Sequence, residues 1–275
     1  MKKILMGLMG LMGLMGIAAC DKIESEDYTV YDGAVITWSE GSAIADPVQR
    51  AYVEKYTGPR CSNCPTADVT LGNIHDARVV MVSINHPIGQ GTPYPNQPDL
   101  RTDGGTAWDQ YFGINAIPAA YINRNTETQY LGDMGTIGGG IDAALGATPV
   151  VALEANATYG SRIDVDVRLE FLEDYSAPVT VTVALVEDSL KYRQLMPDGS
   201  IDEEYVHNHM LRKVVTGFWG RDVDADGRAG EALKGSLSFS APADVVLANS
   251  HVVVFVSDKL SRRVLNCASS AISND

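Results

Sequence analysis

The sequence is poor in basic residues. It carries 21 Lys and Arg against 35 Asp and Glu, which gives a net charge of −14 with the histidines neutral. Sequence-independent binding of nucleic acid and adhesion to anionic lipid both depend on clustered Lys and Arg side chains. The composition therefore argues against both classes of partner.

Long apolar runs are also scarce. After the N-terminus, no stretch approaches the roughly 18 apolar residues of a membrane-spanning helix. At the N-terminus, Lys2 and Lys3 precede an uncharged run that is short for a span and stops at Cys20. This pattern indicates a secretory signal over residues 1–19. Ile17-Ala18-Ala19-Cys20 resembles the bacterial lipobox, in which cleavage precedes the cysteine and that cysteine carries the lipid. The alternative is an ordinary signal in which Cys20 is incidental.

The remaining chain divides into two patterns. Residues 20–47 are expected to be a lipidated tether leading into an edge strand. Residues 48–148 predict strands at 48–56, 78–84 and 119–123, helices at 66–75, 106–112 and 138–145, and a long loop at 85–105. Residues 149–275 predict a β-sandwich, because short strands alternate with turn residues. These strands are expected at 150–157, 163–172, 179–186, 205–216, 233–239, 251–256 and 263–267.

Cysteine is rare, with four in the chain, and two of the four form a CxxC motif. Cys61-Ser62-Asn63-Cys64 lies where a strand gives way to a helix opened by Pro65. A helix N-terminus favours a thiolate, and Arg60 adds a positive charge. The pattern points to Cys61 as a nucleophile and Cys64 as the resolving thiol. A static disulfide and half of a metal site are the alternatives.

A second motif favours the redox interpretation. The segment Tyr111-Phe112-Gly113-Ile114-Asn115-Ala116-Ile117-Pro118-Ala119-Ala120-Tyr121-Ile122 resembles the thioredoxin segment that carries a cis-proline beside the cysteine pair. A cis bond at Pro118 would let the backbone of Ile117 face the disulfide and pair with a substrate chain. The two motifs together predict a thioredoxin-like α/β domain followed by an all-β sandwich.

Longer stretches resemble one family. They are Val53-Glu54-Lys55-Tyr56-Thr57-Gly58, residues 100–124, Tyr205-Val206-His207-Asn208-His209-Met210-Leu211-Arg212 and Gly217-Phe218-Trp219-Gly220. With the CxxC motif, they resemble the Omp28-related outer-membrane lipoproteins of Bacteroidetes. That resemblance implies a thioredoxin-like domain, a β-sandwich, an outer-membrane location and an adhesin-like or receptor-like role.

Three other groups of residues are candidate sites. The first half of a calcium-binding loop resembles the segment that contains Asp222, Asp224 and Asp226. Position twelve of such a loop is a glutamate, whereas here it is Leu233. The alternatives are a looser calcium-stabilised turn and an ordinary acidic turn. His207 and His209 would point to one face of a strand, too few ligands for a metal by themselves. Cys267 is interpreted as a core side chain rather than a redox group.

The sequence thus leaves two functions. The first is disulfide exchange with envelope or surface partners, with Cys61 attacking, Cys64 resolving, Ile117 and Pro118 docking the partner, and no dissociable cofactor. The second is an adhesin- or receptor-like binding protein in which Cys61 and Cys64 form a structural disulfide. In both, the protein is anchored to the outer membrane through Cys20 and faces the periplasm or the exterior.

Overall fold

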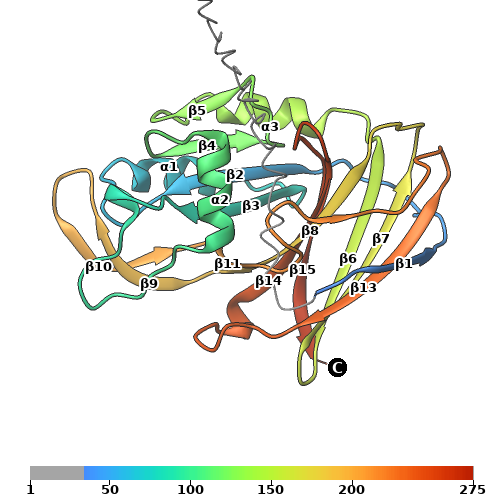
Figure 1. The fold of residues 1–275 in the computed structure, drawn as a ribbon. Coiled ribbons are helices and arrows are strands. Elements are labelled where there is room, and N and C mark those ends of the chain that lie inside the picture. The colour runs from blue at the N-terminus through green and yellow to red at the C-terminus, as the bar shows by residue number, and fades with distance from the viewer. Residues whose placement is uncertain (1–33, 275) are drawn as a thin grey trace, which may run out of the picture.

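The structure is a computed structural model, and it describes residues 34–274 (Figure 1). The predicted signal segment and the lipidation site Cys20 lie outside the described residues. None of the helices within 34–274 has the length and apolar character needed to cross a membrane.

The predicted helices and most of the predicted strands are present in the predicted order. The elements are β1 (Thr37–Glu40), β2 (Ala51–Thr57), α1 (Cys64–Gly72), β3 (Val79–Asn85), η1 (Gly89–Gly91), α2 (Asp103–Phe112), β4 (Ala119–Ile122), β5 (Gln129–Leu131), α3 (Ile137–Leu145), β6 (Val151–Tyr159), β7 (Ile163–Phe171), β8 (Val179–Glu187), β9 (Leu190–Leu195), β10 (Ile201–His207), β11 (Met210–Val214), β12 (Arg221–Asp222), β13 (Ala232–Phe239), η2 (Leu247–Asn249), β14 (Ser250–Asp258) and β15 (Val264–Asn274).

One mixed sheet of 13 strands runs through the described residues. Its order is β1-β13-β7-β6-β15-β14-β8-β11-β3-β2-β4-β5, with β12 beside β8, while β9 and β10 form a separate two-stranded sheet. The predicted mixed α/β class is therefore confirmed. Strands from both sides of residue 148 belong to the same sheet, since β11 pairs with β3. The division into two domains at that position stays a prediction.

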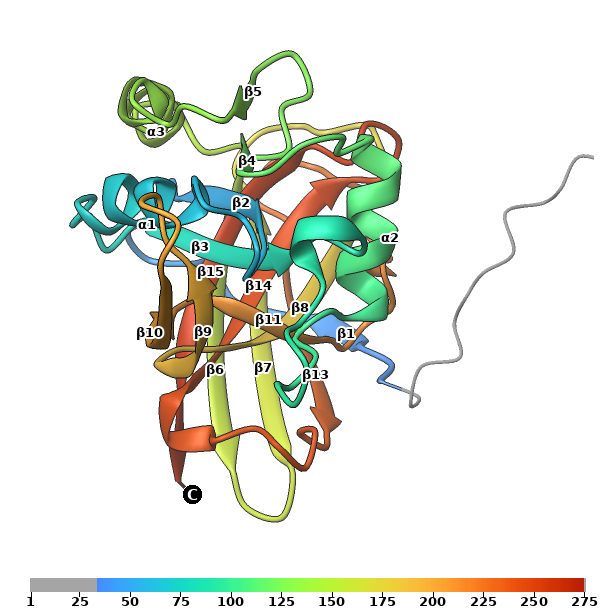
Figure 2. The same ribbon diagram turned by 90° about the vertical axis from the view of Figure 1, so that its left-hand side faces the viewer.

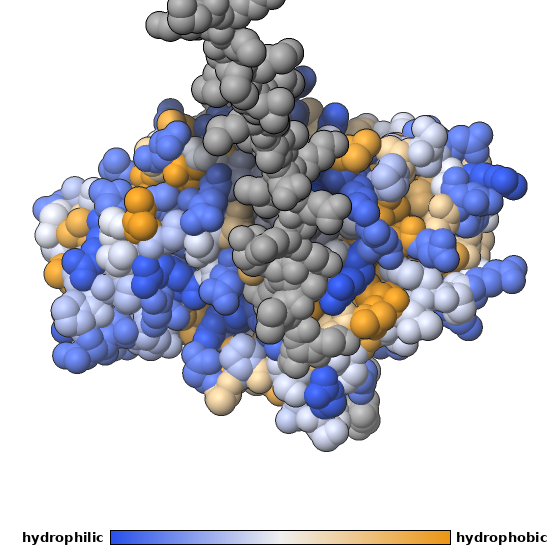
Figure 3. Space-filling view, in the orientation of Figure 1, coloured by the Kyte–Doolittle hydropathy of each residue, from blue (hydrophilic) through white to orange (hydrophobic). Residues whose placement is uncertain are grey.

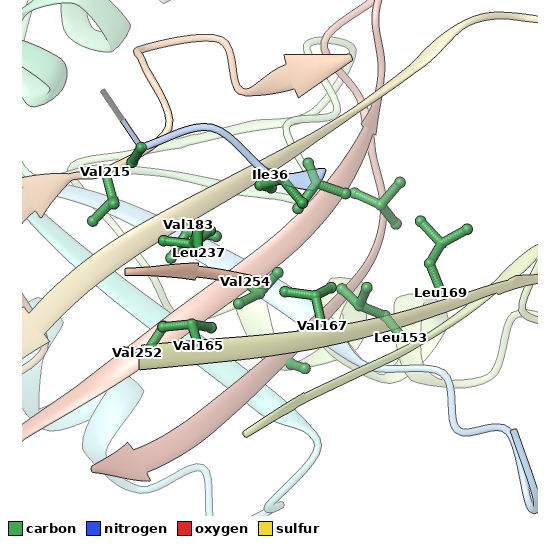
Figure 4. Close-up of a cluster of buried hydrophobic side chains, with 14 of the residues drawn as sticks. Ile36, Leu153, Val165, Val167, Leu169, Val183, Val215, Leu237, Val252 and Val254 are labelled. Atoms are coloured by element: carbon green, nitrogen blue, oxygen red, sulfur yellow. The ribbon is translucent and has the colours of Figure 1, made fainter. Parts of the chain in front are cut away.

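The strand-rich half encloses its own hydrophobic core. Strand β15 pairs with β14 through its first part and with β6 through its last residues, so it connects two layers of strands. Side chains from both layers meet between them, as Figure 4 shows for Val165 and Val167 on one side and Val183, Val252 and Val254 on the other. Burial of these β-branched side chains stabilises the layered arrangement.

Strands β8 and β14 are buried on both faces. Val183 of β8 contributes to the core between the strand layers, whereas its neighbour Ala184 belongs to a second core. In β14, Val254 and Phe255 divide in the same way. Successive side chains of a strand point to opposite faces, so these continuous apolar runs join the strand-rich half to the α/β half.

In the α/β half, helices cover both faces of strands β2, β3 and β4. Trp108 of α2 packs in the second core, and Leu71 of α1 and Ile141 of α3 pack in a third core on the other face. Figure 2 shows α2 on one side of these strands and α1 and α3 on the other. The predicted helices are confirmed, and β5 is an addition that the sequence analysis missed.

A buried ion pair lies in the second core. The Arg124 guanidinium donates to Oε2 of Glu54 from Nε at 2.8 Å and from Nη2 at 2.7 Å. It also lies 4.3 Å from the ring centroid of Trp108 and 4.8 Å from that of Phe255 in β14. Glu54 accepts further hydrogen bonds from Tyr52 and Tyr56. The Glu54 carboxylate thus has a cation and two hydroxyl donors, as a buried charge requires.

The outer surface differs from this interior. On the face drawn in Figure 3, apolar side chains outside the grey atoms form small separate patches among hydrophilic ones. Scattered apolar side chains of this kind are normal on a protein surface and mark no partner by themselves.

Candidate functional site

The cysteine pair forms a disulfide at a strand–turn–helix junction. The S–S distance is 2.10 Å, and the two Cα atoms are 5.4 Å apart. Strand β2 ends at Thr57, and α1 begins at Cys64 with Pro65 in its first turn. The sequence analysis expected Cys61 at the helix N-terminus and Cys64 one turn further in. Cys61 instead lies in the turn before the helix, and Cys64 is the first helical residue.

Both cysteines are buried, each with 1% of its surface exposed. The hairpin of β9 and β10 is hydrogen-bonded to the turn that carries the cysteines. The side-chain amide of Gln194 donates to the Cys61 carbonyl oxygen at 2.9 Å. The Leu195 backbone amide donates to the Pro59 carbonyl oxygen at 2.8 Å. Figures 1 and 2 both place this hairpin beside α1. The hairpin is therefore fixed against the turn that carries the disulfide.

The sequence pattern predicts one strand over 205–216 and no hairpin. The signal was present in Met196-Pro197-Asp198-Gly199-Ser200, a turn sequence in which Gly199 adopts a φ of +85°. The strand prediction for 205–216 is wrong, because the chain leaves β10 after His207 and re-enters the large sheet at Met210.

The predicted long loop at 85–105 is irregular apart from η1 and the first residues of α2, and it packs against the cysteine turn. Arg60 donates its guanidinium to the carbonyl oxygens of Thr92 at 3.1 Å and Pro93 at 2.8 Å. A Cβ atom on Gly58 would lie 2.4 Å from the Gln90 carbonyl oxygen, so only glycine permits this approach. Arg60 thus holds the loop, a role that the sequence analysis did not foresee.

The Ile117–Pro118 bond is cis, as predicted. Pro118 is buried and Ile117 is half-buried. The next residue, Ala119, opens β4 and lies opposite Tyr56 near the end of β2. Since β2 continues from Tyr56 into the cysteine turn, the two predicted motifs lie at the same end of neighbouring strands.

Charged side chains that the sequence analysis did not single out lie between α1 and the hairpin. Lys55 of β2 forms an ion pair with Asp68, which is four residues after Cys64 and therefore on the same side of α1. The Tyr205 hydroxyl in β10 donates to Asp68 Oδ2 at 2.9 Å. These contacts bond the hairpin to the helix that begins at the disulfide.

A buried histidine belongs to the same region. Burial lowers the pKa of His207 from 6.5 to about 4, so its ring is neutral at physiological pH. Among residues 34–274, its Nε2 atom finds no hydrogen-bond partner. Nearby, a cavity of about 80 Å³ is lined by residues that include Lys55, Asp68 and His209.

The structure also places Cys267 and the histidines at positions 207 and 209. Cys267 is buried and free, and burial raises its pKa to about 12, which agrees with a core side chain. His207 and His209 do not share a strand face, since His207 ends β10 and His209 follows it with a φ of +59°.

The three predicted calcium ligands are each exposed. Asp222 forms an ion pair with Lys259 at 2.8 Å, and Asp226 forms one with Arg228 at 3.2 Å. Glu231 accepts hydrogen bonds from three successive backbone amides, those of residues 226–228. Calcium binding by Asp222, Asp224 and Asp226 stays a prediction.

The fold and the site define a class: a mixed α/β protein with one large sheet, a small two-stranded sheet and a buried CxxC disulfide. The family model described as outer membrane protein Omp28 matches residues 105–275. The chain belongs to this family, and its location is accordingly the outer membrane.

One solved structure shares the fold over most of its length. HBP35 of Porphyromonas gingivalis is similar over 83% of this chain and 77% of that chain, with 17% sequence identity and a TM-score of 0.65. A domain of the outer membrane lipoprotein Omp28 from Porphyromonas gingivalis matches 47% of this chain and 93% of its own, at 22% identity and a TM-score of 0.34. No curated protein matches the chain in sequence.

Proposed function

We propose that the protein is anchored to the outer membrane by a lipid on Cys20 and exchanges disulfides with envelope or surface proteins through Cys61 and Cys64. Residues 48–148 then act as a thioredoxin-like module, and residues 149–275 as a β-sandwich. Ile117 and Pro118 dock the partner chain, and no dissociable cofactor is required.

The observation that carries this proposal is the disulfide's place in the fold. It lies between the end of a central strand and the start of a helix, and the turn that carries it is hydrogen-bonded to a two-stranded hairpin outside the main sheet. A two-stranded hairpin has little stability of its own. Local opening of the hairpin therefore costs less free energy than unfolding of the body.

The exchange follows ordinary thiol chemistry. A partner thiolate attacks the Cys61 sulfur, the Cys61–Cys64 bond breaks, and Cys64 leaves as a thiolate. A second partner thiol, after losing its proton, attacks the partner sulfur of the mixed disulfide and releases Cys61 as a thiolate. The partner is oxidised to a disulfide, and the pair is reduced and takes up the two protons.

Trapping tests the proposal. In a Cys267→Ala background, Cys64→Ser leaves Cys61 as a free thiol. Its thiolate should attack disulfides of partner proteins, the reverse of the step above, and accumulate partners as mixed disulfides that reductant releases. The matched variant Cys61→Ser should trap few, because it lacks the attacking sulfur. Equal yields from the two variants, or none from either, would count against exchange.

A second candidate function is favoured by the burial of both cysteines. With 1% of each residue exposed, the disulfide can act as a structural crosslink that fixes the loop and hairpin around it. The protein is then an adhesin- or receptor-like binding protein, and residues 85–105 and the β-sandwich carry recognition. This candidate predicts that the trapping variants recover no partner.

A further inference from the structure

We propose that Asp188, His209 and His251 form a binding site for a divalent transition-metal ion of the Zn²⁺ class. Within residues 34–274, this is the group of three His, Cys, Asp or Glu side chains whose possible ligand atoms all lie within 4.8 Å of one another. Two imidazoles and one carboxylate are a donor set typical of zinc in proteins.

The sheet register explains why three residues distant in sequence converge. In β8, Glu187 lies opposite Met210 of β11 on one side and Ser250 of β14 on the other. Asp188 follows Glu187, and His209 precedes Met210, so these two lie side by side. His251 lies opposite Val186, two residues before Asp188 and hence on the same face of the sheet.

The distances between the ligand atoms fit a zinc ion. Nδ1 of His209 lies 3.1 Å from Oδ1 of Asp188, and Nδ1 of His251 lies 3.3 Å from Oδ2 of Asp188. Zinc binds nitrogen and oxygen at about 2.0 to 2.2 Å in tetrahedral geometry, which separates neighbouring ligand atoms by about 3.4 Å. Both histidines therefore stand near ligating distance of Asp188, and the ligand atoms of all three residues lie within 4.8 Å of one another.

Backbone hydrogen bonds hold the ligands in place. The His209 amide donates to Asp188 Oδ1 at 2.6 Å, and the His209 carbonyl oxygen accepts from the Ser83 amide at 2.6 Å. The Asp188 amide donates to the Asn249 carbonyl oxygen at 2.9 Å. A ligand set that is ordered before the ion arrives loses less conformational entropy on binding.

The site is accessible from solvent. The side-chain exposures are 41% for His209, 32% for Asp188 and 17% for His251. A metal ion can therefore enter and keep a water molecule as its fourth ligand. Calcium and magnesium prefer oxygen ligands, so a site with two imidazoles should reject them.

The three ligands lie at the base of the β9–β10 hairpin, which is hydrogen-bonded to the disulfide turn. Asp188 lies two residues before the first residue of β9, and His209 lies two residues after the last residue of β10. The third ligand, His251, belongs to β14 of the large sheet. A bound ion would fasten both ends of the hairpin to the body. The consequence of a bound ion for the access of partner thiols to the disulfide rests on the proposed function. Metal binding itself does not.

The test is titration of ZnCl₂ into the untagged, metal-free full chain with its disulfide intact, followed by calorimetry. One ion should bind per chain, and His251→Asn or Asp188→Asn should weaken binding by about 100-fold. His75→Asn removes an exposed histidine outside the group and should bind zinc like the wild type. Calcium and magnesium chlorides in millimolar excess should not displace zinc from this site.

Hydrogen exchange tests the fastening separately. Zinc should slow amide exchange across residues 190–207 in the wild type and not in His251→Asn. Wild-type protein that binds no zinc, or His251→Asn that binds it equally well, would overturn the site. Unchanged exchange in zinc-bound wild type would overturn the fastening. None of these results depends on whether Cys61 traps a partner, so a failure of disulfide exchange is distinguishable.

Discussion

The side-chain amide of Gln194 donates to the carbonyl oxygen of Cys61 at 2.9 Å, from a hairpin that is separate from the main sheet. The same nitrogen lies 3.4 Å from the Gly58 carbonyl oxygen. Gln194 is itself buried. Gln194 thus bonds the β9–β10 hairpin to both ends of the turn from Gly58 to Cys61. A substitution at Gln194 should therefore loosen the contact between the hairpin and the disulfide turn.

Gln194→Ala should accelerate reduction of the Cys61–Cys64 disulfide by added reductant. The variant removes the donor to Cys61, and a hydrogen bond contributes about 0.5 to 1.5 kcal/mol, so hairpin opening should become up to about tenfold more frequent. The measurement is the reduction rate under conditions in which the chain stays folded. Gln129→Ala, at an exposed position in β5, is the matched control and should leave the rate unchanged. Equal rates in all three proteins would show that Gln194 does not control access.

Arg124→Ala should strongly destabilise the protein. It leaves the Glu54 carboxylate buried without its cation, a loss that typically costs about 3 to 5 kcal/mol. Denaturant unfolding measures the change. Arg78→Ala, which breaks an exposed ion pair with Asp76, should have little effect. If both substitutions change the free energy of unfolding equally, the buried pair does not stabilise the second core.

His207 should make the stability depend on pH. Its pKa is about 4 in the folded chain and ordinarily 6.5, so below pH 6.5 the unfolded chain binds a proton that the folded chain does not. Above pH 6.5, neutral His207 makes its full contribution to the free energy of unfolding. This contribution is lost as the pH falls toward 4. At pH 5 the loss is about 2 kcal/mol.

His207→Gln should remove this part of the pH dependence. The measurement is denaturant unfolding at several values between pH 4 and pH 7.5. His75→Gln changes an exposed histidine and should keep the wild-type profile. A wild-type profile in His207→Gln would mean that protonation of another group dominates in this range.

Calcium is tested by the melting temperature. If Asp222, Asp224 and Asp226 hold the ion, millimolar calcium should raise the melting temperature and chelator should lower it, because a ligand of the folded state stabilises that state. Asp224→Asn should abolish the shift, while Asp133→Asn, in the α/β half, should retain it. No shift in the wild type would identify an ordinary acidic turn.

The sequence predicted the elements whose signals are local. Pro65 and the apolar run before it predicted the strand and helix around the cysteine pair, and the β-branched run of β8 predicted a buried strand. It did not predict that β8 has a different core on each face, because Val183 and Ala184 look alike in a continuous apolar run. That arrangement depends on which elements pack on each side.

The β9–β10 hairpin beside the cysteine turn was harder to predict from the sequence. Strand β9 mixes Leu190 and Leu195 with charged residues, so its pattern identifies neither a strand nor a partner. Nothing in the sequence pairs Gln194 with Cys61, because 133 residues separate them. Asp188, His209 and His251 likewise come together only through the register of β8 with β11 and β14.

The reduction potential of the Cys61–Cys64 disulfide in the folded full chain tests the central claim most directly. An exchanging pair should equilibrate with glutathione or dithiothreitol buffers at a potential above about −300 mV, within reach of envelope thiols. A potential well below about −300 mV would contradict the account and identify the disulfide as a structural crosslink in a binding protein.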